Sequence, residues 1–484
     1  MRIWPLATPL KNIILYSTSI VLMKGVSLIM LPYIATHLSQ SELGRLEILV
    51  TISVIISIIF GLSLHEALYR FSGTAKKNQQ PQITADIFII SMIMAAIALP
   101  IIWLICPLLS QLSQLQTSTL ELKLLLLPLA FEAVTMVVLS ALRMQEKALL
   151  FFYITTGRAL FHALLTMIVL HYGFGVKAVI LAGFISAMLQ VVVIIYLQYQ
   201  TNKKACINYH ININTTHKYF TYCLPLMFSG LIIFGLNGLE RWFLIFYVSF
   251  NDVALYAVAF KFALILVLLM QPFGMWWMPK RFEYLSNNGV NTTTQITHIS
   301  IVLLCSLTIC VCYFSPVFID WFMPETYHAA KDIVVVLVII FAIKELNELI
   351  NMGALIKQET KKLLVINCLA TVVGVTLIIV LTPEYKVNGV LSALMVAQSI
   401  RTLSTYWLSQ RCFHFPFALN KIAVLFTISA ISIGLSQFQQ TIVFHLSSAI
   451  LSLLILLSYA FWSRLVIFPS INKSKKIIGD NDAI

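Results

Sequence analysis

The sequence predicts an all-α integral membrane protein with about 14 transmembrane helices. Of its 484 residues, 60% are hydrophobic and only 11% are charged, a balance that soluble globular proteins do not have. The apolar residues gather in stretches of about 20 residues or more, the length that a helix needs to cross a bilayer. The connections between the stretches are too short to hold a soluble domain, so the helices account for almost the whole chain.

The predicted spans follow one another with few interruptions. The first is too long for the core of a signal peptide and has no small-residue cleavage site before Glu42, so we expect it to remain as an anchor. The spans cover about residues 10–37, 44–69, 84–109, 122–145, 148–170, 175–198, 219–248, 253–279, 296–320, 331–356, 363–382, 387–409, 418–437 and 443–467.

The net charge of +13 indicates how the helices are oriented. When both termini are placed in the cytoplasm, 21 of the 32 Lys and Arg residues fall in cytoplasmic segments, five in outer loops and six within spans. This bias follows the positive-inside rule, so we expect both termini to be cytoplasmic. No basic patch is interleaved with aromatic residues, which argues against nucleic-acid binding.

The sequence carries no signature of catalysis or of metal binding. It has no phosphate-binding Walker A loop, no dinucleotide-binding glycine pattern and no His-Glu-x-x-His motif, so we expect no enzyme activity and no cofactor. None of the eight cysteines falls in an outer loop, so no disulfide framework is expected. Cys310 and Cys312 lie in a span without a neighbouring His or acid, which favours packing over a metal site.

A faint internal repeat predicts two lobes. The patterns at Ser39–Glu42 and Ser249–Asp252 can each cap a helix, and the helices that follow end at Arg70-Phe71 and Arg281-Phe282, about 210 residues apart. Transporters built from repeats bind their substrate between the repeats, near the middle of the membrane. The predicted parts are an N-lobe at 1–200 (spans 1–6), a C-lobe at 201–412 (spans 7–12), an extra helix pair at 413–468 (spans 13 and 14) and a cytoplasmic tail at 469–484.

Ionisable residues within the predicted spans are the candidates for function. They are Lys24 in span 1, Glu132 in span 4, Arg158 in span 5, Glu240 and Arg241 in span 7, Lys261 in span 8, and Lys344, Glu345 and Glu348 in span 10. The five lysines and arginines among these residues would cost roughly 12 kcal/mol or more on insertion scales if their side chains faced lipid. They must therefore face protein partners or a water-filled cavity.

Two interpretations of these charges remain open from the sequence. A cationic interior would bind an anionic substrate, because phosphate oxygens accept charge-assisted hydrogen bonds from Arg and Lys. Alternatively, the charges are static ion pairs, and the acids could also bind a proton or a sodium ion. Arg401, near the cytoplasmic end of span 12, can snorkel towards water, so we do not count it among the site residues. The expected static pairs are Glu132 with Arg158, Glu240 with Arg241, and Lys344 with Glu348.

Motifs in both halves resemble the polysaccharide flippases of the MATE-like (MOP) superfamily, the O-antigen or Wzx-type transporters. In the first half they are residues 10–14 (LKNII), 31–44 (LPYIATHLSQSELG) and 61–71 (GLSLHEALYRF). In the second half they are Leu224-Pro225, Glu240-Arg241 and residues 256–261 (YAVAFK). Glu240 stands where the family more often has Asp, and Ala254 stands near a usual Gly. The resemblance covers spans 1–12 and implies two six-helix MATE-like lobes plus the C-terminal helix pair.

The resemblance also implies a function in the bacterial cytoplasmic (inner) membrane. Such a flippase moves an oligosaccharide on undecaprenyl pyrophosphate to the periplasmic leaflet by alternating access, for O-antigen, lipopolysaccharide or other surface polysaccharide. Membrane lipids, a proton or sodium counter-ion and a polysaccharide polymerase complex are the implied partners. We expect Lys24, Arg158, Arg241 and Lys261 to be the cavity cations that bind the substrate.

The acids and the remaining lysine are candidates for ion coupling or for pairing: Glu132, Glu240, Lys344, Glu345 and Glu348. Three other functions compete with the flippase. The first alternative is a MATE-type drug/cation antiporter, a class that usually has twelve spans and often acidic substrate sites. The others are a polysaccharide polymerase or ligase, and a passive scaffold in a biosynthetic complex.

Overall fold

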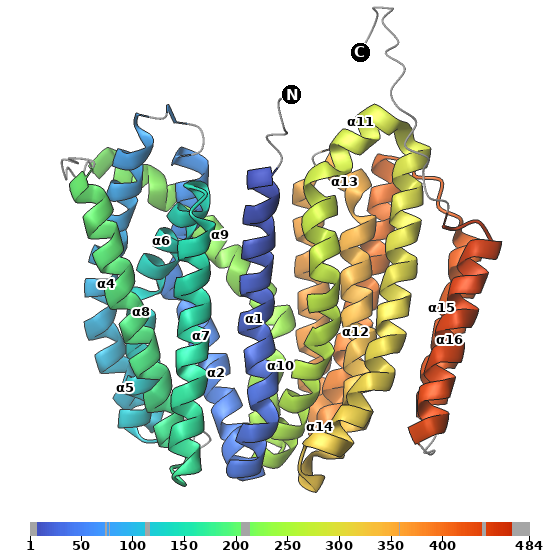
Figure 1. Ribbon diagram of the computed structural model, residues 1–484, viewed down its shortest axis with the longest axis horizontal. Helices are drawn as coiled ribbons and strands as arrows, with labels where there is room; N and C mark the ends of the chain where they lie inside the picture. Colours follow the sequence, from blue (N-terminus) through green and yellow to red (C-terminus); the bar gives the residue numbers. More distant parts are fainter. Residues whose placement is uncertain are drawn as a thin grey trace, which may run out of the picture.

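The computed structural model is an all-helical bundle (Figure 1), and it describes residues 7–72, 75–76, 78–111, 117–204, 213–357, 359–437 and 442–466. No strand occurs within these ranges. The predicted tail at 469–484 and Cys206 lie outside the described residues. The helices are α1 (Ala7–His37), α2 (Gln40–Gly61), α3 (Leu64–Ala67), α4 (Gln80–Ser110), α5 (Thr119–Leu126), α6 (Glu132–Met144), α7 (Ala148–His171), α8 (Val176–Lys204), α9 (Ile213–Asn237), α10 (Leu239–Tyr247), α11 (Phe250–Phe322), α12 (Ala330–Ile350), α13 (Met352–Ile356), α14 (Thr360–Cys412), α15 (Leu419–Ser436) and α16 (Ile442–Trp462).

The prediction of an all-α membrane protein with about 14 transmembrane helices is confirmed. Within the described residues, 11 helices are long and apolar enough to cross a membrane. The longest of them, Lys361–Cys412, contains two crossings, because the backbone of Lys386 leaves the helical conformation (φ 49°) and turns the chain back. Helix α12, with 21 residues, is also long enough for a crossing. It is not among the 11 apolar helices because it carries charged residues, including Lys344, Glu345 and Glu348.

Local sequence explains where the helices begin and break. Ser39 and Ser249 each form a capping box with the acid three residues later, as the repeated patterns predict, and Ser118 does the same before α5. Helix α2 ends where Leu62 and Ser63 adopt left-handed conformations, and α3 continues the same span. The chain inside α11 kinks at Gly289, whose φ of 78° suits a residue without a side chain.

The helices lie roughly parallel across the molecule (Figure 1). Helices α4 to α8 form one side, α11, α12 and α14 form the other, and α1, α2 and α10 run between them. Helices α15 and α16 lie at the outer edge and pack against α11. The division of the chain at residues 200 and 412 stays a prediction.

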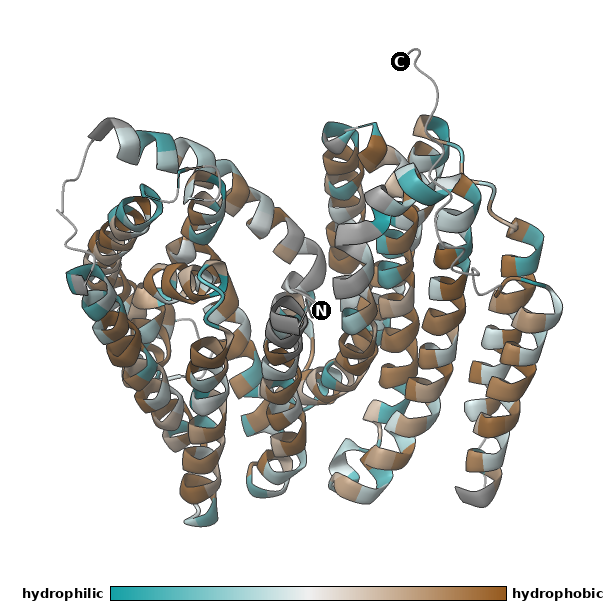
Figure 2. Cartoon of the chain, turned by 45° about the horizontal axis from the view of Figure 1, so that its top comes forward, coloured by the Kyte–Doolittle hydropathy of each residue, from teal (hydrophilic) through white to brown (hydrophobic). Residues whose placement is uncertain are grey.

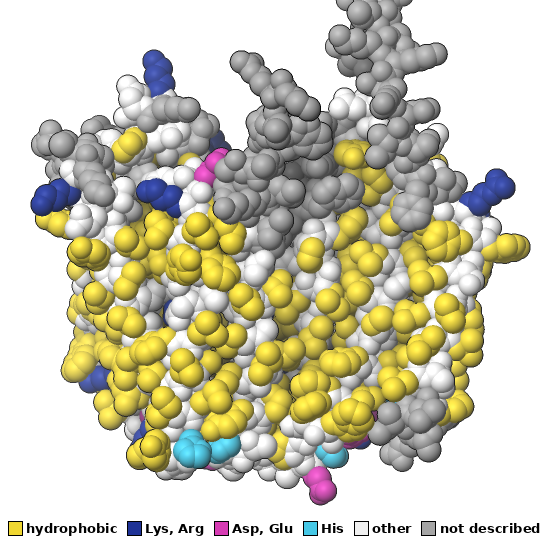
Figure 3. Space-filling view, viewed as in Figure 1, with side chains coloured by type: hydrophobic (Ala, Val, Ile, Leu, Met, Phe, Trp, Pro, Cys, Tyr) yellow, Lys and Arg dark blue, Asp and Glu magenta, His cyan; other side chains and the backbone are white. Residues whose placement is uncertain are grey.

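The surface of the bundle is apolar over most of its height. In Figure 2 the helices are hydrophobic along most of their length, and the hydrophilic segments lie mainly at their ends. Figure 3 shows hydrophobic side chains across the middle of one face, with most charged and His side chains near the upper and lower margins. Leu104, Leu164 and Leu403 are among the large apolar side chains that are more than half exposed. This surface matches a multi-pass membrane protein.

Candidate functional site

The first and second halves of the chain touch where α2 and α11 begin. A Cβ atom on Gly44 would lie 1.9 Å from the carbonyl oxygen of Phe250, so only glycine permits this approach. One turn earlier, the Gln40 amide donates hydrogen bonds to the carbonyl oxygens of Asn251 (3.4 Å) and Thr326 (3.2 Å). This contact brings the buried face of α2 against α11 close to the first residues of both helices.

Glu47 of α2 is at the centre of the candidate site. Its side chain is buried, and it accepts hydrogen bonds from Arg241 of α10 and Lys261 of α11. The Arg241 Nη1 atom lies 3.1 Å from one carboxylate oxygen, and the Lys261 Nζ atom contacts the other. The predicted cavity cations Arg241 and Lys261 are therefore brought together, and they share one carboxylate.

These three side chains lie well inside the membrane-spanning part of the bundle. Glu47 is the eighth residue of α2, so it lies about 10 Å along the helix from its first residue. Lys261 is the twelfth residue of α11, which is about 16 Å from that helix start. The Arg241 guanidinium also lies over the ring of Phe260, at 4.3 Å from its centroid. We refer to Glu47, Arg241 and Lys261 as the bridging triad.

Glu240 is buried beside the triad but has a different partner. The Tyr256 hydroxyl donates to its Oε1 atom at 3.3 Å, and its Oε2 atom has no hydrogen-bond partner among the described residues. The expected pair between Glu240 and Arg241 is not formed. Consecutive residues on a helix point about 100° apart, so the two side chains face different neighbours.

Glu348 of α12 is held by three side chains. Arg401 of α14 donates from Nη2 at 3.3 Å, and the Asn347 and Asn351 amides donate at 3.3 Å and 3.1 Å. Arg401 also donates from Nε to the side-chain Oδ1 atom of Asn367 at 2.8 Å. The expectation that Arg401 snorkels was wrong, because neighbours on two other stretches of chain supply it with acceptors inside the bundle.

The predicted pair between Lys344 and Glu348 is not formed either. The Lys344 ammonium lies 5.8 Å from the centroid of the Phe341 ring instead. It interacts electrostatically with Glu345, Arg401, Glu348 and Glu240. The charged residues of α10, α12 and α14 therefore form one connected polar region next to the bridging triad.

Arg158 and Glu132 belong to the first half of the chain. Arg158 of α7 donates from Nη1 to the Gln190 side chain of α8 at 2.8 Å, and it lines a groove of about 380 Å³ between these two helices. Glu132 is near enough to interact electrostatically with Arg158, but no ion pair joins them. The expected pair is replaced by the Gln190 contact, which the sequence did not indicate.

Lys24 is the least constrained of the four predicted cavity cations. Its side chain is exposed and has no hydrogen-bond or ion-pair partner among the described residues. It lies on α1, which packs mainly against α7 and also contacts α11. Ser19, five residues earlier on the same helix, bonds to the hydroxyl of Thr155 at 2.6 Å and so fixes α1 against α7.

Sequence reasoning missed Glu47. The predicted second span begins at residue 44, which places Glu47 at a helix end and not among the acids inside the membrane. The signal was present, because any acid within a span needs a partner or a function. Within the described residues, no group of three or more His, Cys, Asp or Glu side chains could hold a metal ion.

Comparison with known proteins gives one family and several similar structures. The family described as "Polysaccharide biosynthesis protein" matches residues 9–285, more than half of the chain. No curated protein matches the sequence.

Three solved structures illustrate the similarity of the fold. The lipid II flippase MurJ in an inward closed conformation has a TM-score of 0.71 at 14% identity, covering 95% of this chain and 100% of that one. The MATE multidrug transporter DinF-BH has a TM-score of 0.57 at 12% identity, covering 84% and 96%. A MATE family multidrug resistance transporter in an outward-facing conformation has a TM-score of 0.54 at 15% identity, covering 82% and 95%. These likenesses establish the fold, which the chain shares with MurJ and the MATE transporters.

Proposed function

The chain belongs to the polysaccharide biosynthesis protein family, and from this premise we propose that it is a flippase for lipid-linked oligosaccharide. Its substrate is a repeat unit on undecaprenyl pyrophosphate, which it moves across the bacterial cytoplasmic membrane for O-antigen or another surface polysaccharide. The observation that supports this most is the bridging triad, in which two deep cations from the second half of the chain share one carboxylate from the first.

The triad offers a way to bind and release a diphosphate. Arg241 and Lys261 together carry two positive charges, and Glu47 neutralises one of them. A diphosphate has more negative charge and more acceptor oxygens than a carboxylate, so it can replace Glu47 on both cations. When Glu47 leaves, Arg241 and Lys261 lose their shared counter-charge, and this gives the cationic surplus that the substrate needs.

The same exchange would couple binding to alternating access. Glu47 connects α2 to α10 and α11, and Gly44 closes the same contact on the side where α2 and α11 begin. When the substrate takes over Arg241 and Lys261, this connection is lost and α2 can separate from α11. We propose that the moving lobes are residues 1–200 and 201–412, that residues 413–468 are an added helix pair, and that both termini are cytoplasmic.

Lys24 and Arg158 complete the proposed set of substrate cations. The exposed side chain of Lys24 on α1, a helix that contacts α11, can reach an anionic group without first breaking an ion pair. Arg158 already donates a hydrogen bond to Gln190. It can therefore bind the substrate only if this hydrogen bond breaks or if the guanidinium bonds to Gln190 and the substrate together. We therefore rank Arg241, Lys261 and Lys24 above Arg158. The coupling ion and a polysaccharide polymerase partner remain parts of the same proposal.

A MATE-type drug/cation antiporter is the second candidate. Glu240 favours it, because a buried carboxylate with one oxygen lacking a partner among the described residues suits a proton or a small cation. The MATE structures cover 82–84% of the chain, whereas the MurJ structure covers 95%. The greater coverage supports the flippase.

Reconstituted vesicles separate the two functions. The purified protein is placed in liposomes with undecaprenyl-pyrophosphate oligosaccharide confined to one leaflet, and a lectin in the outer solution measures its appearance on the other. We expect transfer by the native protein, loss in Arg241→Gln/Lys261→Gln, and retention in the control Lys177→Gln/Lys203→Gln, whose lysines are exposed at helix ends. Ethidium efflux without transfer of the lipid-linked sugar would support the antiporter and overturn the flippase.

A further inference from the structure

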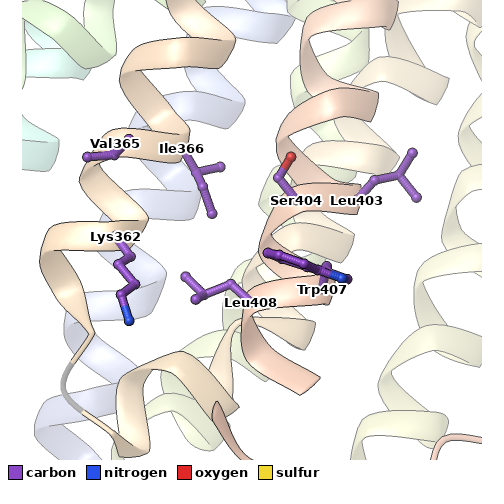
Figure 4. Close-up of a pocket in the computed structure, with 7 residues that line it drawn as sticks. All are labelled: Lys362, Val365, Ile366, Leu403, Ser404, Trp407 and Leu408. Carbon is purple, nitrogen blue, oxygen red and sulfur yellow. The ribbon is translucent and has the colours of Figure 1, made fainter. Parts of the chain in front are cut away.

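A groove separates the two arms of α14 on the surface of the bundle (Figure 4). It has a volume of about 550 Å³ and lies between the crossing that begins at Thr360 and the crossing that ends at Cys412. Val365, Leu403 and Trp407 line it and are each more than half exposed, so the groove is open to the surroundings of the helices. Its full lining is Lys362, Val365, Ile366, Leu403, Ser404, Trp407 and Leu408.

The groove is polar at one end only. Lys362 lies near the start of the first arm, and Trp407 and Arg411 lie near the end of the second. Because Lys386 turns the chain back, these two positions are at the same end of the bundle, on the side predicted to be cytoplasmic. Deeper in the membrane the exposed side chains are apolar, and they include Leu369 and Ile400. A groove that is basic at one end and apolar along its length matches a phospholipid of one leaflet, whose charged headgroup lies at the membrane surface and whose acyl chains lie in its interior.

The charges at the polar end favour one class of lipid. The Lys362 ammonium is paired with Glu359 at 2.8 Å, and both side chains are exposed enough to change partners. The Arg411 guanidinium lies over the ring of Trp407, a lining residue, at 3.6 Å from its centroid, which places it next to the groove. Lys361, Lys362 and Arg411 outnumber Glu359 at this end, so its net charge is positive and complements the negative charge of a phosphodiester. A zwitterionic lipid would bring its own cation against Arg411.

We propose that this groove binds an anionic phospholipid of the cytoplasmic leaflet. Its phosphate is held between Lys362 and Arg411, the Trp407 indole packs at the level of the glycerol backbone, and one acyl chain lies along Val365 and Leu403. The site is separate from the bridging triad, and it does not depend on the transported substrate. Ser404 projects into the groove from the second arm and gives a position at which the groove can be filled.

Native mass spectrometry of the full chain in detergent tests this site. Phosphatidylglycerol and phosphatidylcholine with identical acyl chains are added at equal concentrations, and the bound lipids are counted. We expect the native protein to prefer phosphatidylglycerol, and this preference to fall by about fivefold for each basic residue removed in Lys362→Gln and Arg411→Gln. The Lys177→Gln/Lys203→Gln variant has lost as many surface charges elsewhere and should keep the preference.

A second variant separates loss of charge from loss of the groove. Ser404→Phe fills the groove without changing any charge, so it should lower the binding of both phospholipids. Equal binding of the two phospholipids by the native protein, or an unchanged preference in Lys362→Gln/Arg411→Gln, would overturn the proposal. If undecaprenyl diphosphate displaces phosphatidylglycerol stoichiometrically and shows the same dependence on Lys362, the groove belongs to the carrier lipid and the phospholipid site is refuted.

Discussion

Gly44 and Phe250 bring the two halves of the chain into backbone contact. The ideal Cβ position on Gly44 is 1.9 Å from the Phe250 carbonyl oxygen and 2.8 Å from its carbonyl carbon, closer than any side chain can lie. Gly44 lies five residues after the helix cap Ser39 and Phe250 lies directly after the helix cap Ser249, so the two contact points are near the starts of α2 and α11. The position of Glu47 against Arg241 and Lys261 depends on this approach, since Glu47 lies only three residues beyond Gly44.

Replacement of Gly44 by alanine should separate α2 from α11. The added methyl group meets backbone atoms, which cannot rotate away, so we expect a loss of about 1–3 kcal/mol of stability, as in overpacked cores. Thermal unfolding in detergent measures the effect. Gly157→Ala is the matched control, because nothing lies within 4 Å of its Cβ position and alanine favours a helix. An unfolding temperature of Gly44→Ala equal to that of the control would contradict the contact.

Glu47→Gln should destabilise the protein more than any other replacement of a single acid in the first half of the chain. The change keeps the volume of the side chain but leaves Arg241 and Lys261, whose side chains are 11% and 26% exposed, without their shared counter-charge, at a cost of about 3 kcal/mol. Glu146→Gln provides the comparison, because Glu146 is exposed. Unfolding in mixed micelles at increasing SDS gives both free energies. If the two variants unfold alike, Glu47 does not hold Arg241 and Lys261 together.

Much of the architecture could be predicted from the sequence, because hydrophobic length and helix capping are local properties. The spans and the capping boxes at Ser39 and Ser249 depend on residues close together in the chain. The depth of Arg241 and Lys261 could be predicted for the same reason. The pairing of both with Glu47 could not be predicted, since Glu47 is about 200 residues away and its role depends on how close Gly44 lets two helices come.

The pairing of the charges was the part that sequence could not give. Glu240 and Arg241 are neighbours in the chain but contact different partners, Tyr256 and Glu47, and Lys344 and Glu348 share a helix face but find other contacts. Sequence spacing states which pairs are within reach on one helix. It does not state which acceptors a neighbouring helix brings closer, such as Asn367 for Arg401.

A double-mutant cycle on Glu348 and Arg401 should detect their ion pair. The Arg401 side chain is 13% exposed and that of Glu348 is 41% exposed, so solvent weakens the interaction and we expect a coupling of about 1 kcal/mol. The same cycle on Lys344 and Glu348, with each residue changed to Gln, should give a smaller coupling. Unfolding free energies of the single and double variants measure both. Additive effects for Glu348 and Arg401 would contradict the pair.

Joining α2 to α11 covalently should stop the proposed transport cycle. Gln40 donates to the Asn251 carbonyl, so cysteines at these two positions lie within reach of a short bifunctional thiol reagent. In a background with all eight native cysteines replaced by alanine, the reagent should abolish transfer of lipid-linked oligosaccharide in Gln40→Cys/Asn251→Cys, and a cleavable linker should restore transfer after reduction. Each single cysteine variant, treated in the same way, should remain active because no bridge can form. Full transfer by the bridged protein would show that α2 and α11 need not separate, and would remove the basis for coupling substrate binding to the release of Glu47.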